Sequence, residues 1–176
     1  VVSAGTGLGK AAAVWDGTRH HPLATEAGHA DFAPISPIEL ELSNWLRGRY
    51  GGHASIERVI SGPALQDIAE FLVASGRCKM LPGLAALPEK DQPAELTRLA
   101  LAGREPLAAA TFDVFTAVLA RELGNAALEY LALGGVALAG GIPPRIVSLL
   151  QQQHFVANIV DKGRFTKLLQ SLPIRI

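Results

Sequence analysis

The chain has 176 residues, 49% of them hydrophobic, which is enough to bury one core of ordinary domain size. Its 16 basic residues balance 16 acidic ones, so it lacks the positive charge with which proteins bind DNA or an anionic membrane surface. Every apolar stretch is interrupted before it reaches the roughly 20 residues that cross a bilayer. A single cysteine, Cys78, excludes an internal disulfide, leaves zinc without its usual ligands and indicates a reducing cytoplasm.

A glycine-rich run at residues 3–10 is typical of loops that hold phosphate. Its alternating glycines allow consecutive backbone N–H groups to turn toward an anion. The spacing excludes a P-loop, because Ala4 and Ala11 stand where the first glycine and the magnesium-binding hydroxyl belong. It also excludes a dinucleotide-binding turn, because the residues that follow are not helical. A glycine-rich hairpin without a ligand is the alternative, and a chain that begins inside such a loop is expected to be a piece of a longer protein.

The residues after the loop predict a β-hairpin. Residues 11–15 are typical of a strand, Asp16 and Gly17 of a tight turn, and residues 18–23 of a returning strand. The glycine-rich loop is therefore expected to join two strands. In the next loop Glu26 and His29 are three residues apart, a spacing that lets both side chains enter one pocket and bind adjacent hydroxyl groups of a polyol. An exposed loop without a ligand is the alternative.

Two capped helices come next. Ser36, followed by proline and then by Glu39, forms a capping box and predicts a helix over residues 37–50. Ser61 precedes glycine and proline and predicts a second helix that ends near Gly76.

A short apolar segment at residues 56–60 lies between these two helices. Glu57 lies within it, just before a valine and an isoleucine that are expected to be buried. The residues by themselves leave Glu57 open either as a functional carboxylate or as a surface group paired with Arg58.

The second half of the chain predicts an α/β architecture. Residues 77–92 are expected to form a loop, followed by a short helix at 93–102 and the longest helix at 106–133. The apolar residues 136–139 predict a buried strand that ends at Gly140 and Gly141. Further helices and a last short strand at 173–176 complete a sheet with helices packed on it. Ligands of such folds gather at the carboxyl ends of strands, although the two glycines by themselves favour a simple tight turn.

Several of these segments resemble, in order and at compatible spacing, the bacterial ATP-dependent glucokinases of the actin-like, hexokinase-type superfamily. Each segment alone is weak evidence, but together they cover nearly the whole chain. The matching segments are residues 5–9 (GTGLG), 26–34 (EAGHADFAP), 57–63 (ERVISGP), 139–145 (AGGIPPR) and 161–165 (DKGRF).

The resemblance implies a ribonuclease H-like, actin-like ATPase fold, with residues 1–176 as the large domain and a mixed sheet with flanking helices. It implies that Glu26, His29 and Glu57 bind hydroxyl groups of glucose. One departure is Ala27, which stands where many relatives carry glycine and fits the same loop only with a negative φ. The resemblance further implies a phosphate loop that holds the nucleotide, formed by Gly5, Thr6, Gly7 and Gly9. It also implies a turn near the adenosine, formed by Gly140 and Gly141.

The implied reaction is phosphoryl transfer from Mg²⁺-ATP to the 6-hydroxyl of glucose. Members of the family carry a first phosphate loop and the general base, an aspartate, in a small N-terminal domain, and neither motif occurs in this chain. No catalytic residue is therefore assigned here, and residues 1–176 alone are expected to be inactive. The sequence does not distinguish glucose from mannose or glucosamine, and it assigns no role to residues 161–165.

Two other interpretations stay open. One is a non-catalytic domain that binds a sugar or nucleotide or serves assembly. The other is a sugar-responsive repressor or kinase, although that group has a cysteine-rich zinc motif and this chain has one cysteine. The expected partners are glucose and ATP, with a homodimer as a candidate assembly, no nucleic acid and no membrane.

Overall fold

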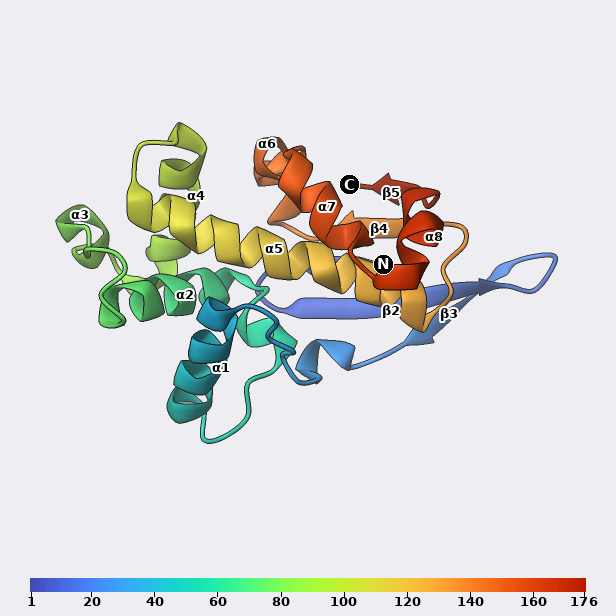
Figure 1. Cartoon of the computed structure of the whole chain (residues 1–176), viewed down its shortest axis with the longest axis horizontal. Helices are drawn as coiled ribbons and strands as arrows, with labels where there is room; N and C mark the ends of the chain where they lie inside the picture. Colours follow the sequence, from blue (N-terminus) through green and yellow to red (C-terminus); the bar gives the residue numbers. More distant parts are fainter.

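The centre of the computed structural model, which describes all residues 1–176, is a five-stranded mixed sheet (Figure 1). Its strand order is β3-β2-β1-β4-β5. β1 pairs antiparallel with β2 and parallel with β4, and Val2 of β1 is in register with both Lys10 and Leu138. The two halves of the chain therefore meet in the middle of the sheet, at β1 and β4. The strands are β1 (Val2–Ala4), β2 (Leu8–Trp15), β3 (His20–Ala24), β4 (Val136–Ala139) and β5 (Ile174–Arg175).

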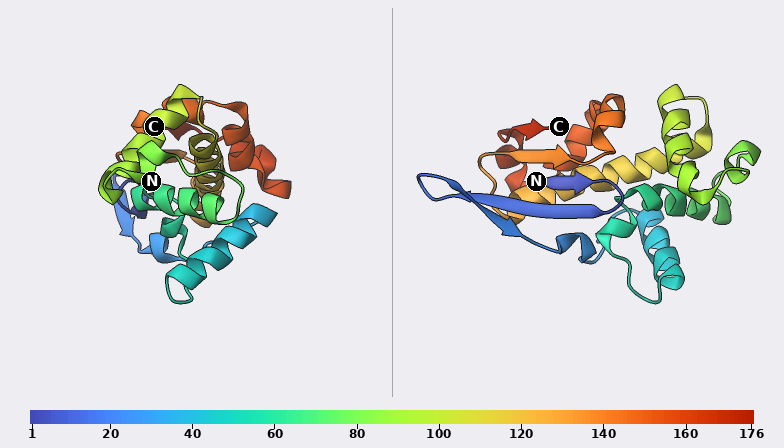
Figure 2. Two further views of the ribbon diagram at one scale, coloured as in Figure 1. Left: turned by 90° about the vertical axis from the view of Figure 1, so that its left-hand side faces the viewer. Right: turned by 180° about the vertical axis from the view of Figure 1, so that it is seen from behind.

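The predicted hairpin is confirmed, and it projects from the body of the molecule (Figures 1 and 2). Trp15 pairs with His20 at its far end, where Gly17 has a φ of 103°. Asp16 Oδ1 accepts hydrogen bonds from the backbone N–H groups of Thr18 (2.8 Å) and Arg19 (2.9 Å). Led by the bond from Arg19, these contacts hold the pKa of Asp16 well below its usual range, so the carboxylate stays charged and closes the turn.

Eight α-helices surround the sheet. Four of them, α1 to α4, lie at the end of the molecule opposite the hairpin tip (Figure 2). None is long and apolar enough to span a membrane. The helices are α1 (Pro37–Arg49), α2 (Gly62–Ala74), α3 (Pro82–Ala85), α4 (Gln92–Ala102), α5 (Pro106–Glu129), α6 (Val147–Leu150), α7 (Gln153–Val160) and α8 (Thr166–Gln170).

Both predicted helix caps are present. Ser36 Oγ accepts the N–H of Glu39 (3.4 Å), and Ser61 Oγ accepts that of Ala64 (3.3 Å). The capping box is modified, however, because the Glu39 carboxylate accepts the N–H of Ile35 (3.0 Å), one residue before the cap. Its side chain therefore fixes the end of the preceding loop as well as the start of α1.

The prediction for the longest helix was wrong at its end, since α5 stops at Glu129 and not at residue 133. The N–H of Ala132 bonds to the carbonyl of Ala127 (2.9 Å) and that of Leu131 to Leu128 (3.2 Å), which is a Schellman motif. Leu131 occupies the left-handed position with a φ of 43°, where glycine is usual. Smaller differences are a helical turn, α3, within the expected loop 77–92 and a 3-10 turn, η2 (Ile56–Arg58), in the short segment before α2.

The core surrounds α5, which packs against other helices and against β1 and β4 of the sheet. Phe115, Leu119 and Leu123 of α5 are fully buried, and α2 and α7 pack against this helix. Alternate residues of β1, of the first part of β2 and of β4 are buried, as expected for strands covered on one face. In β2 this face includes Lys10, a charged residue among apolar neighbours, with 5% of its surface exposed.

Candidate functional site

The glycine-rich loop is a tight turn between β1 and β2, as the sequence predicts. The N–H of Gly5 bonds to the carbonyl of Gly7 (2.9 Å), and the carbonyl of Gly5 accepts the N–H of Gly62 at the start of α2 (2.7 Å). Thr6 is exposed at the tip of the turn. Gly9 lies within β2 in register with Ser3, so it is part of the sheet. The first turn of α2 is thus joined to the loop, with its positive dipole end beside it.

The second glycine turn, after β4, packs against the end of β1. Gly140 has a φ of 99°, and a Cβ atom there would lie 2.1 Å from the carbonyl oxygen of Ala4. That same oxygen accepts the N–H of Ile142 (3.2 Å). Only glycine fits so close an approach with this backbone conformation, and it brings Gly141 beside Gly5.

A cavity of about 620 Å³ opens where the two glycine turns meet. Gly5, Thr6 and Gly141 form one end of it. The volume falls within the range of about 300–1,000 Å³ that is usual for small-molecule sites. Polar residues to which the sequence assigned no role also line it: Gln66 of α2, Lys90 in the turn before α4, Thr97 of α4 and Arg145 in the turn after Gly141.

Glu57 lies on the other side of the β1–β2 turn. Its Oε2 accepts the backbone N–H of Leu8 (2.9 Å), and Gly7 is so close that a Cβ atom there would lie 2.6 Å from this oxygen. Oε1 makes no hydrogen bond within the chain. Gly5 and Thr6 of the turn therefore line the cavity, whereas Gly7 and Leu8 lie against the partly buried carboxylate of Glu57.

The loop with Glu26 and His29 lies beside Glu57. Its turn η1 (Ala27–His29) presses Gly28 against β2, where a Cβ atom would lie 2.0 Å from the carbonyl oxygen of Leu8. The carbonyl of Ala30 accepts the N–H of Ile56 (2.8 Å), which joins this loop to the turn that carries Glu57. The side chains of Glu26 and His29 are exposed and make no hydrogen bonds within the chain.

Ala27 has a negative φ, as its place in this loop requires. The expected departure from glycine at this position therefore causes no backbone strain.

Residues 161–165 lie apart from the cavity. Lys162 packs near α5, where a Cβ atom on Gly124 would approach both its side chain and the carbonyl of Ile159. Burial lowers the pKa of Lys162, and the nearby Arg121 lowers it further. Residues 161–165 therefore pack against α5 through Lys162.

The chain offers no group of three or more His, Cys, Asp or Glu side chains that could hold a metal ion. Mg²⁺ commonly binds through substrate phosphates and water with only one or two protein carboxylates. A magnesium ion carried by substrate phosphates would not need such a group.

The fold and the paired glycine turns define the class. The chain has a mixed sheet in this order with helices packed on it, and two glycine turns that meet beside a cavity at the strand ends. This arrangement is that of the ribonuclease H-like, actin-like ATPase class. The family model described as glucokinase matches residues 1–176, and the chain belongs to the glucokinase family.

Known glucokinases align with the whole chain. The glucokinase of Synechocystis sp. is 36% identical over 190 aligned residues, which cover 100% of this chain and 54% of that protein. The glucokinase of Neisseria meningitidis is 36% identical over 176 residues, which cover 100% of this chain and 51% of that protein. The chain thus spans about half the length of these relatives.

Solved glucokinase structures share the fold. One from an Antarctic psychrotroph superimposes with a TM-score of 0.81 at 30% identity, covering 98% of this chain and 51% of that one. A second, from Balamuthia mandrillaris in complex with glucose, gives a TM-score of 0.82 at 18% identity, covering 98% and 48%.

Proposed function

We propose that residues 1–176 are the large domain of an ATP-dependent glucokinase, which transfers the terminal phosphoryl group of ATP to the 6-hydroxyl of glucose. The observation that carries the proposal is the position of the β1–β2 turn between two sets of groups. On one side is a cavity large enough for a nucleotide, and on the other is the Glu57 carboxylate. A phosphoryl group held at Thr6 would lie next to a sugar held at Glu57, as in-line transfer requires.

The nucleotide is assigned to the cavity of about 620 Å³. The Thr6 hydroxyl and the N–H groups of Thr6 and Gly7 would donate hydrogen bonds to phosphate oxygens, while Gly9 supports the turn from within β2. Gly140 and Gly141 would allow the adenosine to approach the end of β4. Mg²⁺ bound to the phosphates supplies charge neutralisation.

The sugar is assigned to Glu26, His29 and Glu57. Carboxylate oxygens accept hydrogen bonds from hydroxyl groups, and an imidazole ring can donate or accept one. Glu57 uses Oε2 to bind Leu8, which leaves Oε1 free for a hydroxyl group. The general base is expected outside residues 1–176, so the role of this chain is to bind and orient both substrates.

The test is a coupled glucose-phosphorylation assay on the full-length protein, with Glu57→Gln as the variant. Glutamine keeps an oxygen to accept the Leu8 N–H but removes the charge. Losing one charge-assisted hydrogen bond costs about 1.5–3 kcal/mol, or roughly 10- to 150-fold in the KM for glucose. Asp113→Asn, at an exposed residue of α5 without a hydrogen-bond partner, is the matched control and should leave KM unchanged.

Two results would contradict the proposal. One is a full-length protein that binds glucose and ATP without turnover, which would support a non-catalytic domain. The other is full activity in Glu57→Gln. The isolated fragment 1–176 should show no turnover. The single free Cys78 supports a cytoplasmic location, and a homodimer stays a prediction that light scattering on the full-length protein tests.

A further inference from the structure

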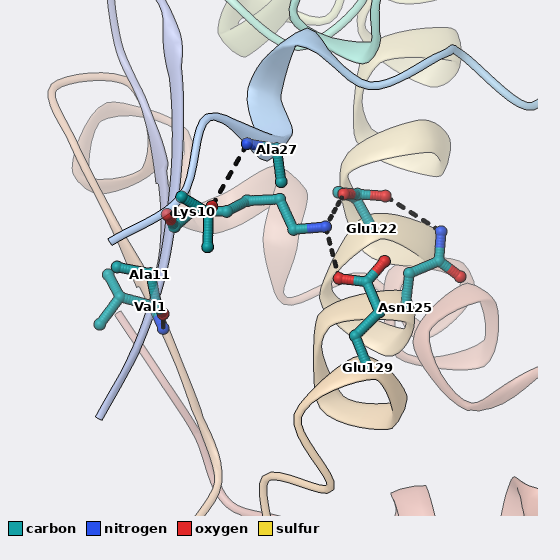
Figure 3. A network of polar contacts seen from close by, with 8 residues as sticks. Val1, Lys10, Ala11, Ala27, Glu122, Asn125 and Glu129 are labelled. Atoms are coloured by element: carbon teal, nitrogen blue, oxygen red, sulfur yellow. Dashed lines mark hydrogen bonds and ion pairs between the residues drawn. The ribbon is translucent and has the colours of Figure 1, made fainter. Parts of the chain in front are cut away.

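A buried ion cluster joins β2 to α5 beneath the candidate sugar loop (Figure 3). The ammonium of Lys10 lies 2.7 Å from Glu122 Oε1 and 2.7 Å from Glu129 Oε2. Asn125 Nδ2 donates to the second oxygen of Glu122 (3.0 Å). Burial lowers the pKa of Lys10, but the hydrogen bonds and charges of the two glutamates outweigh burial and raise it, so the ammonium stays charged. We call these four residues the Lys10 cluster.

A second buried ion pair involves Arg121, the residue of α5 that precedes Glu122. Arg121 Nη2 lies 2.6 Å from Glu39 Oε1, and both side chains are almost fully buried. The other carboxylate oxygen of Glu39 accepts the N–H of Ile35 (3.0 Å). Through Glu39, Arg121 therefore holds the point at which the sugar loop enters α1.

The loop of residues 25–35 is attached to both groups. At its start, Thr25 Oγ1 donates to the carbonyl of Lys10 (2.8 Å) and accepts the N–H of Ala27 (3.3 Å). At its end, Ile35 is bound by Glu39. The side chains of Lys10 and Arg121 thus fix the strand and the helix on which the two ends of the loop rest.

Between its two ends the loop is not fully backed by packed side chains. A cavity of about 220 Å³ lies there, with the Lys10 cluster on one side and Ala30, Asp31 and Ala33 of the loop on the other. In the middle of the loop, Phe32 is buried in the core and its N–H bonds to the carbonyl of Ala54 (2.8 Å). The position of the loop over α5 is thus set by Phe32, by Gly28 on β2 and by the attachments at the two ends of the loop.

We propose that Lys10 and Arg121 are positioning residues for sugar binding, because their ion pairs to α5 and α1 hold both ends of the loop that carries Glu26 and His29. This inference rests on the proposed function. Neither residue is expected to touch the sugar. The nucleotide side of the site is held by other contacts, those of Gly5 with Gly62 and of Ala4 with Ile142, so its geometry does not depend on these ion pairs.

Removing Lys10 or Arg121 leaves a buried carboxylate, that of Glu122 or of Glu39, without its cation. In Lys10→Met the carboxylates of Glu122 and Glu129 face each other without a cation, which favours water entry and separation of β2 from α5. In Arg121→Met the Glu39 carboxylate loses its ion pair while it still binds Ile35. Either change should move the sugar loop, and a shift of about 1 Å in a binding group can cost up to about 10²-fold.

The test measures KM for glucose and for ATP separately in the full-length protein. We expect Lys10→Met and Arg121→Met to raise the KM for glucose about tenfold or more, with the KM for ATP changed less than about twofold. Lys10→Arg keeps a cation in the cluster and should restore most of the affinity for glucose. The matched control is Arg49→Met, which breaks the ion pair to the buried Asp67 (3.1 Å) at the far end of α1 and should lower Tm without changing either KM.

An unchanged KM for glucose in Lys10→Met and Arg121→Met, with a fall in Tm like that of Arg49→Met, would overturn the inference. If Lys10→Met does not fold, Glu129→Gln replaces it, because this side chain is 48% exposed and its change is mild. A rise of about threefold in the KM for glucose supports the inference, and no rise overturns it. A wild-type protein without glucose phosphorylation would instead refute the proposed function.

Discussion

Replacing Gly28 by alanine would place a methyl group 2.0 Å from the carbonyl oxygen of Leu8. Real Cβ contacts are essentially never shorter than 3.0 Å, so the loop and β2 must separate by about 1 Å. Either movement would shift a residue that we propose binds the sugar. If the loop moves, Glu26 and His29 are displaced, and if Leu8 moves, it disturbs the N–H that binds Glu57.

A displacement of about 1 Å in a positioning group can cost about 10²-fold in rate, which corresponds to about 2.7 kcal/mol of transition-state stabilisation. We therefore expect Gly28→Ala to lower kcat/KM for glucose by about 10²-fold in the full-length protein. The affinity for ATP should change little, because Gly28 does not line the nucleotide cavity.

The coupled assay should be paired with a control at Gly48 of α1, where an added Cβ atom meets nothing within 4 Å. Gly48→Ala should keep full activity and raise the free energy of unfolding by up to about 1 kcal/mol, because alanine favours helix. If Gly28→Ala retains kcat/KM within about threefold of wild type, the tight contact with Leu8 does not position the sugar loop, and the reasoning fails.

Three further predictions concern stability and are measured by chemical denaturation. Leu131→Gly should raise the free energy of unfolding by about 0.5–1 kcal/mol, since it relieves a left-handed φ at an exposed residue, and a loss would contradict the assigned Schellman motif. Gly124→Ala should lower it by about 1–3 kcal/mol, because a Cβ atom would lie 2.3 Å from the carbonyl of Ile159, and an unchanged value would refute the close packing of α5 on α7. Burial raises the pKa of Asp67 above its usual 3.8, so the native state retains a proton there that the unfolded chain has lost. The contribution of Asp67 to the free energy of unfolding therefore falls as pH rises from 3.8 through the raised pKa. Asp67→Asn should remove this dependence of stability on pH, and an unchanged dependence would show that Asp67 is not its source.

Local patterns in the sequence predicted most of the elements. The hairpin, the caps at Ser36 and Ser61 and the strand before Gly140 all depend on neighbouring residues, and all are confirmed. The end of α5 was missed because a leucine, and not a glycine, takes the left-handed position there.

Contacts between distant parts of the chain were not predictable in the same way. Nothing in the sequence around Lys10 distinguishes it from an ordinary strand residue, and its partner Glu129 is 119 residues away. The cavity residues Lys90 and Arg145 likewise come from separate elements that only the fold brings together. The spacing of Glu26 and His29 predicted a polyol site, whereas glucose itself and the role of Glu57 came from resemblance to a family; all three roles stay predictions until binding is measured.

The register of β1 has a consequence for how the chain folds. β1 can pair with β2 as soon as both have been synthesised, but its other neighbour, β4, lies beyond all of α5, where Val2 meets Leu138. Closing so long a loop is slow, because its entropic cost precedes any gain from pairing. During synthesis the β1–β2 pair would therefore wait with one edge of β1 unpaired until α5 and β4 have left the ribosome, and the cavity between the two glycine turns could form only then.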